Sequence, residues 1–422
     1  MSGPDSRPDA PAGLADARES ASVPAQATSR PGPSEDPAVP LPGSDPAAWM
    51  LDPRIDFLNH GSFGARPRAV VAAQQSLRVD FEARPIEWLD RRRRDMVAEA
   101  QARVGAFLGM PPDRFGFVAN ASAAVCSVLR SLEFEPGDEI VTTDHAYGAV
   151  MRTIEHVARR TGAVPVIATV PVPVGGPGDV LEAVARCLGP RARLLVVDHV
   201  TSPTAIVLPA AELARLAHER GVRCLVDGAH APGMLPLDVA SIGADWYAGN
   251  LHKWCCAPVG AAFLHAAPAA PRVHPPVISH FHEESLVEEF GWQGTRDITP
   301  WLTAATAIEW MASAGGPGGW TAVRAANDAL ADEAAGILAA AWGTGPTAPR
   351  AMRGSMAAVE IPEPLAARGL EAEAMRDRLA AEHGIEGPIL DFAGRRWARV
   401  SAQLYNRREQ YERLAAVVTA GV

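Results

Sequence analysis

The sequence predicts an α/β protein, with a mostly parallel sheet covered by helices on both faces and a smaller α+β domain at the C-terminus. Short apolar segments alternate with helical segments between residues 115 and 264. Such alternation is typical of parallel sheets with crossover helices. After residue 300 the pattern changes to longer helices and a few separated strands. A chain of 422 residues is long enough for two such domains.

The large domain is expected over residues 48–300, and a linker helix and the small domain over 301–422, with part of the N-terminal segment joining the small domain. The expected strands of the large sheet are 115–118, 139–143, 164–170, 194–198, 223–227 and 261–264. The expected helices are 67–85, 91–107, 122–132, 148–160, 180–188, 210–220, 301–314 and 320–341. The small domain is expected to contain the elements 356–361, 375–383 and 396–401.

Residues 1–47 are rich in Pro, Ala, Gly, Ser and Asp and poor in aromatic side chains. Such a composition cannot bury enough apolar surface to offset the entropy lost on ordering. The sequence therefore predicts a disordered N-terminal tail.

Charge and composition limit the classes of partner. A formal net charge of −10 disfavours nucleic-acid and anionic-membrane partners, because both require a basic surface. The four arginines at 91–94 lie in a helical pattern, where a solvated face or a subunit contact is expected. No apolar run has the length of a membrane span, and no signal-peptide pattern is present. Five cysteines without C-x-x-C or metal-type spacing favour a reduced, cytoplasmic setting and predict no metal site.

The segment 225–254 places an acid and a lysine at the ends of two neighbouring apolar stretches. Asp227 ends one stretch and Lys253 follows the other. A lysine that condenses with a carbonyl cofactor must spend time neutral, and apolar neighbours favour this by lowering its pKa. A nearby carboxylate can keep a cofactor's ring nitrogen protonated, so the pair predicts pyridoxal 5'-phosphate (PLP). The ordinary alternatives are a helix-capping Asp and a solvated surface Lys.

The string GNLHKW resembles the cofactor-lysine segment of class V aminotransferases, which are PLP enzymes of fold type I (aspartate aminotransferase-like). Together with FLNHGSFG, HVTSPT and WQGTRD it is similar to the isopenicillin N epimerase-like subgroup. The resemblance covers nearly everything from about residue 56 to the C-terminus. It implies a seven-stranded-type sheet, a homodimer with shared active sites, and a small-molecule amino-acid substrate.

The resemblance also implies which residues hold the cofactor. Small residues open a helix directly after strand 115–118, and a helix N-terminus is a ready phosphate site, although an ordinary N-cap is the plainer reading. Gly294 and Thr295 are expected to reach the phosphate of the neighbouring subunit. The other positions that the resemblance assigns to the cofactor are Ala121, Ser122, His145, Tyr147, Thr204, Asp227, His230, Asn250, His252 and Lys253. Either His145 or Tyr147 is expected to stack on the cofactor ring.

Arg399 lies in RVSAQLYN, which resembles the C-terminal segment whose arginine grips the substrate α-carboxylate. A guanidinium suits that task because its planar fork gives two parallel hydrogen bonds, whereas the alternative role is a salt bridge between domains. Ser202 is expected on the side of the substrate or the cofactor O3', and Asn59 and His60 at the mouth of the site. In catalysis Lys253 is the expected base.

Three reactions are compatible with this site. The four signatures together favour epimerisation or racemisation at Cα, with Tyr147 or His145 as the second acid. Cleavage of a C–S bond in a cysteine conjugate, as in ergothioneine-type lyases, is the second, and transamination is the third. A persulfide-forming desulfurase is disfavoured because no Cys follows Cys256. A catalytically inactive dimeric binding protein would not need Asp227, Lys253 and Arg399 together.

Overall fold

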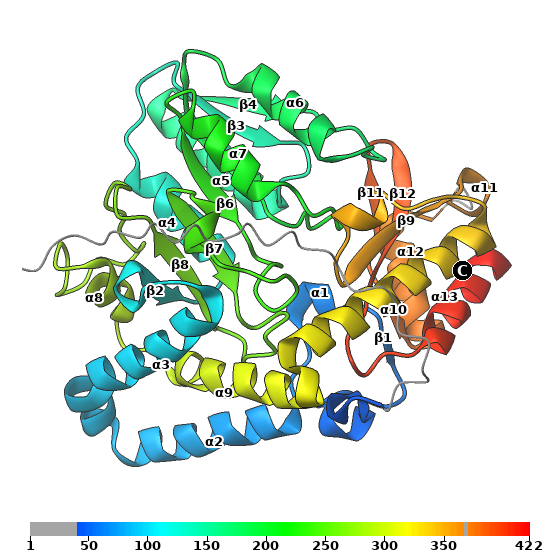
Figure 1. Cartoon of the computed structure of the whole chain (residues 1–422), viewed down its shortest axis with the longest axis horizontal. Helices are drawn as coiled ribbons and strands as arrows, with labels where there is room; N and C mark the ends of the chain where they lie inside the picture. The colour runs from blue at the N-terminus through cyan, green and yellow to red at the C-terminus, as the bar shows by residue number, and fades with distance from the viewer. Residues whose placement is uncertain (1–39, 367–369) are drawn as a thin grey trace, which may run out of the picture. The chain divides into compact units, whose positions relative to one another are not determined.

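The computed structural model describes residues 40–366 and 370–422, which belong to one compact unit, Pro40–Val422 (Figure 1). Residues 1–39 of the predicted disordered tail lie outside the described residues. At residues 40–47 the structure differs from that prediction. Two short 3-10 helices, η1 (Pro42–Ser44) and η2 (Pro46–Ala48), form there, and the Trp49 indole N–H donates to the Gly43 carbonyl over 3.0 Å. Trp49 is fully buried, so an aromatic anchor just beyond the apolar-poor tail fixes its last residues.

The large sheet has seven strands in the order β2-β8-β7-β6-β5-β3-β4. Only β8 runs antiparallel to its neighbours, which confirms the mostly parallel sheet. Its strands are β2 (Phe115–Val118), β3 (Glu139–Thr143), β4 (Val164–Ala168), β5 (Ala192–Asp198), β6 (Arg223–Asp227), β7 (Trp246–Asn250) and β8 (Ala262–Ala266). The strand absent from the expected set is β7, which occupies the apolar segment before Lys253.

Helices cover both faces of this sheet (Figure 1). Strand β5 shows why: Leu195 and Val197 face one core, whereas Leu194 and Val196 face the other. Strands buried on both faces need this continuous apolar sequence. The first core receives α2 (Arg68–Ala83), α3 (Arg93–Leu108), α6 (Pro177–Cys187), α7 (Ala210–His218) and α9 (Thr299–Ala314), and the second α4 (Ala121–Ser131), α5 (Gly148–Thr161) and α8 (Leu286–Gly291).

The C-terminal part forms the predicted α+β region around a three-stranded antiparallel sheet of order β11-β12-β9. Its elements are α10 (Gly319–Trp342), β9 (Met356–Ile361), α11 (Glu363–Ala366), α12 (Ala372–His383), β10 (Ile385–Glu386), β11 (Ile389–Phe392), β12 (Arg395–Ser401) and α13 (Arg408–Ala420). The N-terminal segment joins this region, because β1 (Asp56–Phe57) pairs in parallel with β10. Because α9 packs into the large core, the domain boundary near residue 300 stays a prediction.

The arginine run at 91–94 does not form one solvated face. A π-helical turn, Glu87–Arg92, precedes α3, and Arg93 is only 5% exposed. Its guanidinium lies over the rings of Phe281 and Trp292, so it anchors the segment around α8. The other three arginines of the run are exposed, as expected. None of the helices in the described part of the chain is long and apolar enough to cross a membrane.

Candidate active site

The candidate site lies at the carboxyl ends of the central strands. The pairing of β5 with β6 sets Asp198 beside Asp227, and Asp227 is in turn paired with Ala248 of β7. Lys253 follows β7 by three residues. Ligands bind at this edge in open parallel sheets, and the topology brings the predicted acid and lysine there together.

Lys253 is held in a state suited to nucleophilic chemistry. Its Nζ lies 3.1 Å from His230 Nε2. Burial, followed by the charge of Arg399, lowers the pKa of Lys253 to about 7, although Asp227 and Asp198 oppose the shift. At neutral pH a substantial fraction of this amine is therefore unprotonated, as attack on a carbonyl requires.

The backbone of Lys253 is fixed by α1 (His60–Phe63) and the residues after it. The Nε2–H of His60 donates to the Lys253 carbonyl over 3.1 Å, and its Nδ1 accepts from the Tyr405 hydroxyl over 2.9 Å. Gly64 has a φ of +70°, and a Cβ there would lie 2.4 Å from the His252 carbonyl oxygen. His60 is fully buried, and burial lowers its pKa to about 3. His60 therefore supports the lysine peptide, and its predicted place at the mouth of the site stays a prediction.

Two carboxyl groups lie side by side beneath the site. Asp227 Oδ1 accepts from the backbone N–H of Ala229 over 3.0 Å, and burial raises the pKa of Asp227. Burial also raises the pKa of Asp198 well above its usual range, and the charge of Asp227 adds to the shift. Asp198 is not among the predicted site residues, although its place at the end of an expected strand is a usable signal.

A phenol and an imidazole, also without a predicted role, lie near Asp227, whose carbonyl accepts from the backbone N–H of His199 over 2.8 Å. The Tyr247 hydroxyl lies 2.7 Å from His199 Nδ1. A Cβ on Gly228 would lie 2.2 Å from that hydroxyl, so only glycine permits this approach next to Asp227. Burial raises the pKa of Tyr247, followed by the effect of Asp227, and the phenol stays a neutral hydrogen-bonding group.

The N-terminus of α4 faces the end of β7. Asn120 caps the helix by accepting from the Ala123 N–H over 2.8 Å, and Asn250 Oδ1 accepts from the Ala121 N–H over 2.8 Å. Within the described residues the Ser122 hydroxyl has no hydrogen-bond partner. This small, polar helix start is available to an anion. The Nδ1–H of His252 donates to the Ala261 carbonyl over 3.0 Å, and the expected contact of this residue with the phosphate stays a prediction.

His145 and Tyr147 occupy different environments. His145 is buried, its Nε2–H donates to the Val170 carbonyl over 3.3 Å, and its Nδ1 accepts from the Thr204 hydroxyl over 2.6 Å. Thr204 also receives a hydrogen bond from Thr201, so its hydroxyl orients His145 rather than standing free for a ligand. Tyr147 is 46% exposed. Which of the two stacks on the cofactor stays open.

Arg399 is buried without an acidic partner. Its guanidinium donates to the Ser202 carbonyl over 2.5 Å, to the Ser62 hydroxyl over 2.9 Å and to Asn59 Oδ1 over 3.2 Å. No carboxylate lies within ion-pair distance of it among residues 40–366 and 370–422. Arg395 and its neighbour at 396, by contrast, pair with acids. The interdomain salt bridge is therefore the weaker reading, and burial lowers the pKa of Arg399 to about 10.

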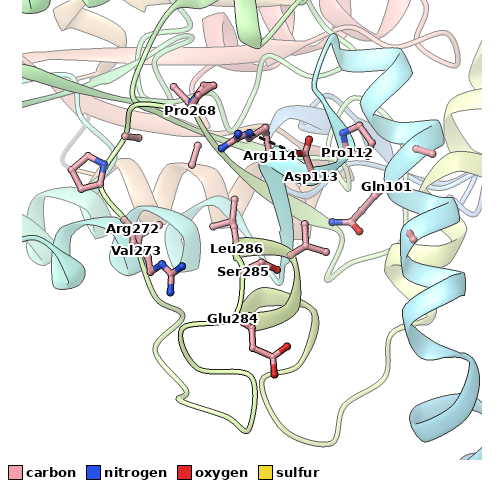
Figure 2. A pocket seen from close by; sticks show the side chains of 17 residues that line it. Gln101, Pro112, Asp113, Arg114, Pro268, Arg272, Val273, Glu284, Ser285 and Leu286 are labelled. Carbon is pink, nitrogen blue, oxygen red and sulfur yellow. Dashed lines mark ion pairs between the residues drawn. The ribbon is translucent and has the colours of Figure 1, made fainter. Parts of the chain in front are cut away.

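A pocket of about 350 Å³ opens beside this guanidinium and is lined by Tyr147, Ser202, Phe392 and Arg399. A larger pocket of about 790 Å³ lies elsewhere, lined by α3 and by residues of the segments 112–114, 266–273 and 284–287 (Figure 2). None of the predicted site residues lines the larger pocket, so volume does not locate the chemistry here.

Gly294 and Thr295 lie apart from these groups in the chain. They follow α8 in a turn where Gly294 has a φ of +90° and Thr295 is exposed. No contact joins them to Lys253 within the described part of one subunit. Their predicted role across a subunit boundary stays a prediction.

The residues present fit PLP. Two buried nitrogens, His230 Nδ1 and Arg399 Nε, have no hydrogen-bond partner among the described residues. Buried orphan donors are costly and indicate a ligand that completes them. A partly neutral lysine suits an aldehyde, a buried carboxyl group suits a pyridine nitrogen, and the start of α4 suits a phosphate.

One further sequence signal was missed. Lys253 is the only lysine in the 422 residues, so the other 38 of the 39 Lys and Arg side chains are arginine. This lysine lies at the carboxyl end of the sheet, and its amine can condense with a carbonyl group, which a guanidinium does not do.

Comparison with known proteins decides the family. The family model described as aminotransferase class-V matches residues 64–414. The chain belongs to the class-V aminotransferase family. It is 35% identical over 386 residues to an isopenicillin N epimerase of Amycolatopsis lactamdurans, covering 86% of this chain and 94% of that protein. It is also 32% identical over 400 residues to a putative L-cysteine desulfhydrase of Oryza sativa subsp. japonica, covering 86% and 82%.

Solved structures agree on the fold. A cysteine desulfurase from Thermococcus onnurineus NA1 superimposes with a TM-score of 0.74 at 18% identity, covering 91% of this chain and 98% of that one. The cystine C–S lyase C-DES, solved with cysteine persulfide, gives a TM-score of 0.72 at 20% identity, covering 87% and 98%. This class-V chain thus has the predicted fold type I, and PLP is the cofactor of its family.

Proposed function

We propose that this class-V enzyme is an epimerase or racemase acting at Cα of an amino acid or of a substrate that contains one. The observation that carries the proposal is the 35% identity, over nearly the whole length, to an isopenicillin N epimerase. The site supplies the groups that the reaction needs: a base, an acid and a carboxylate anchor.

Lys253, Asp227 and the start of α4 at Ser122 would hold PLP. The bound cofactor withdraws electrons from the substrate and so makes its Cα proton acidic. Asp227 keeps a proton at the ring nitrogen, and His230, whose Nε2 lies 3.1 Å from Lys253 Nζ, is placed beside the amine that would hold the cofactor. Lys253 Nζ, which is partly neutral at pH 7, removes the Cα proton.

Arg399 binds the substrate α-carboxylate and fixes the Cα–H bond relative to Lys253. Its network already contains Ser202 and Asn59, so the guanidinium is oriented before a substrate arrives. Tyr147 lines the same pocket, and its hydroxyl has no hydrogen-bond partner among the described residues. Proton delivery from Tyr147 to Cα would invert the centre.

Cleavage at Cβ is the second candidate, because relatives at 32% identity are putative L-cysteine desulfhydrases. Loss of a sulfur group requires the same base and cofactor, followed by departure of the leaving group. Transamination would need Lys253 to return the proton to the cofactor carbon. No cysteine follows Cys256, so a persulfide carried on the C-terminal third is excluded for this sequence.

The proposed enzyme acts as a cytoplasmic homodimer in which Thr295 contributes to the partner's site. Support comes from the GWQGTRD turn, at residues 291–297, in which Thr295 is exposed and makes no contact with Lys253 of its own chain among the described residues.

A solvent-exchange assay separates the reactions. The purified PLP-bound protein is incubated in D₂O with isopenicillin N, L-cysteine and a panel of other L-amino acids, and products are analysed by mass spectrometry and chiral chromatography. Deuterium at Cα with inversion supports the epimerase. Pyruvate together with sulfide or a thiol, formed from cysteine substrates, would show a lyase instead of an epimerase. A 2-oxo acid that retains the substrate's side chain would show a transaminase.

A further inference from the structure

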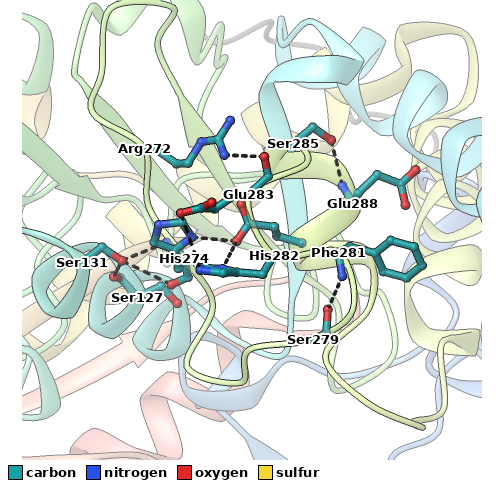
Figure 3. Close-up of polar contacts among 11 residues, drawn as sticks. Ser127, Ser131, Arg272, His274, Ser279, Phe281, His282, Glu283, Ser285 and Glu288 are labelled. Atoms are coloured by element: carbon teal, nitrogen blue, oxygen red, sulfur yellow. Dashed lines mark hydrogen bonds and ion pairs between the residues drawn. The ribbon is translucent and has the colours of Figure 1, made fainter.

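The connection between β8 and α8 brings two histidines and a glutamate together, far from Lys253 along the sheet. His274 and His282 lie side by side in Figure 3, with ring centroids 4.8 Å apart. Glu289, from α8, meets both: its Oε2 is 2.7 Å from His274 Nδ1 and 3.5 Å from His282 Nδ1. The three residues thus present their ligand atoms to a common point.

The Glu289 carboxylate lies in an unusual environment. Its side chain is only 2% exposed, and the next residue, Phe290, packs into the apolar core against Gly116. One oxygen, Oε1, is buried and has no hydrogen-bond partner among the described residues. A carboxylate withdrawn from water needs partners for its lone pairs, and one histidine hydrogen bond does not provide them.

We propose that His274, His282 and Glu289 bind a divalent transition-metal ion of the Zn²⁺ class. The three ligand atoms lie within 4.8 Å of one another. Tetrahedral Zn²⁺ with bonds of about 2.0–2.2 Å places its ligand atoms about 3.3 Å apart, so side-chain shifts of about 1 Å close the site. Two imidazole nitrogens and one carboxylate match Zn²⁺, Co²⁺ or Ni²⁺, whereas Mg²⁺ and Ca²⁺ require a set of oxygens.

The proton inventory of the site is consistent. Both histidines would coordinate through Nδ1 as neutral rings and keep their remaining proton on Nε2, with the fourth position taken by water on the exposed side. His282 Nε2 is 3.8 Å from a Glu283 carboxylate oxygen, which is the kind of outer partner that orients a metal-bound imidazole. The backbone N–H of His274 donates to the Ser131 hydroxyl over 2.8 Å, which ties the site to α4 (Figure 3).

Such an ion would join the 267–285 connection to α8 immediately before the GWQGTRD turn. Its effect would be to order that segment, because a metal that binds only the folded form stabilises it. The ligands are separated by seven and six residues of irregular sequence, which explains why no compact motif marked them. The proposal is independent of the reaction at Lys253.

The test uses the full-length, PLP-bound protein after tag removal and dialysis against a chelator. Isothermal titration calorimetry with ZnCl₂ and elemental analysis should give one Zn²⁺ per chain, and Zn²⁺ should raise the melting temperature. Loss of a residue that only orients a metal ligand lowers metal affinity by about tenfold or more, and loss of a ligand should cost at least as much. His282→Ala and Glu289→Gln should therefore each weaken Zn²⁺ binding by at least about tenfold. His280→Ala, an exposed histidine in the same segment, is the matched control and should bind as the parent does.

Glu289 is buried, so the Glu289→Gln protein could fail to fold. The His282 side chain is 39% exposed, so the His282→Ala protein is expected to fold and still tests the site. Co²⁺ gives a second readout, since a tetrahedral site absorbs strongly in the visible range and His282→Ala should remove that band. The proposal is overturned if the parent protein binds no Zn²⁺ at millimolar concentration. Equal Zn²⁺ affinity in the parent, His282→Ala and His280→Ala proteins would overturn it as well.

Discussion

The candidate site has two sides that are built differently. The cofactor side, defined by Ser122, Asp227 and Lys253, stands on the ends of adjacent core strands and one helix start. The carboxylate side, defined by Asn59, Ser202 and Arg399, is assembled from three segments; Arg399 reaches partners 197 and 340 residues away in sequence. The first side is fixed by strand register, whereas the second depends on how the antiparallel β-sheet packs on the large one.

This difference suggests a division of labour. A group fixed by register can be kept unchanged while the surrounding loops vary, and this suits a shared cofactor. A guanidinium held only by neutral oxygens from distant segments is sensitive to their packing, and this suits a substrate. Relatives named as epimerases and as desulfhydrases share the family. Substitutions on the two sides should therefore have separable kinetic effects.

Replacement of Lys253 by Ala should have the largest effect. Loss of the covalent anchor and of the base should lower turnover by more than about a thousandfold. Borohydride should fix the cofactor to the parent chain at Lys253 and to none of the variant's side chains, as read by peptide mass spectrometry. Partial rescue by methylamine would show that the missing group is the amine, and cofactor mass on a peptide without Lys253 would refute the assignment.

Asp227→Asn should come next, with turnover lowered by about 10²–10³-fold because a preorganised charge is removed. The substrate KM should change little, since Asp227 belongs to the cofactor side. Ultraviolet-visible spectra should show that PLP remains bound. Full turnover in this variant would remove Asp227 from the chemistry.

Arg399→Lys should affect the other side. The loss of a bidentate grip should lower kcat/KM by about 10–100-fold, since hydrogen bonds to charged groups contribute about 1.5–3 kcal/mol, and most of the loss should be in KM. Arg395→Lys is the control, because that arginine pairs with Glu360 on the surface. If Arg399→Lys lowers the melting temperature while kcat and KM are unchanged, the residue is structural.

The pH dependence of cofactor binding should show the state of Lys253. Its pKa of about 7 belongs to the cofactor-free chain, and only the neutral amine attacks the aldehyde. The neutral fraction rises with pH, so the rate of reconstitution with PLP should level off above about pH 7 and fall by about tenfold per pH unit below it. Stopped-flow absorbance measures this rate of reconstitution between about pH 5 and pH 9. A rate still rising near the usual lysine pKa would contradict the burial argument.

Thr295→Ala should have the smallest effect, with a loss of a few-fold in PLP affinity. If Thr295 serves the neighbouring subunit, mixing the Thr295→Ala protein with the Lys253→Ala protein should create hybrid dimers in which one site has both native residues. A gain to the parent's PLP affinity in the cofactor linked to Lys253, after subunit exchange, supports the shared site. Demonstrated exchange without such a gain would confine Thr295 to its own chain.

The two sides of the site also differ in how well they could be predicted from the sequence. The cofactor side was predictable because Asp227 and Lys253 lie at strand ends, where apolar alternation reports position directly. Lys253 itself was marked even more strongly by the absence of any other lysine. The contacts of His60 with the Lys253 carbonyl and of Thr204 with His145 could not be predicted, since pairings across about 190 and 60 residues leave no local pattern. The ligand roles expected of His60 and Thr204 stay predictions. Asp198 was passed over because register between strands, and not spacing within one, brings it to Asp227.

The lone lysine has a consequence for selectivity toward reactive carbonyl compounds. Aldehydes normally distribute over the many amines of a protein surface, and most of those adducts are without effect. Here every other basic side chain is a guanidinium or an imidazole, and the one side-chain amine is buried beside His230. A small aldehyde of the right shape has a single side-chain destination in this chain, so its binding and its effect on the enzyme become the same event.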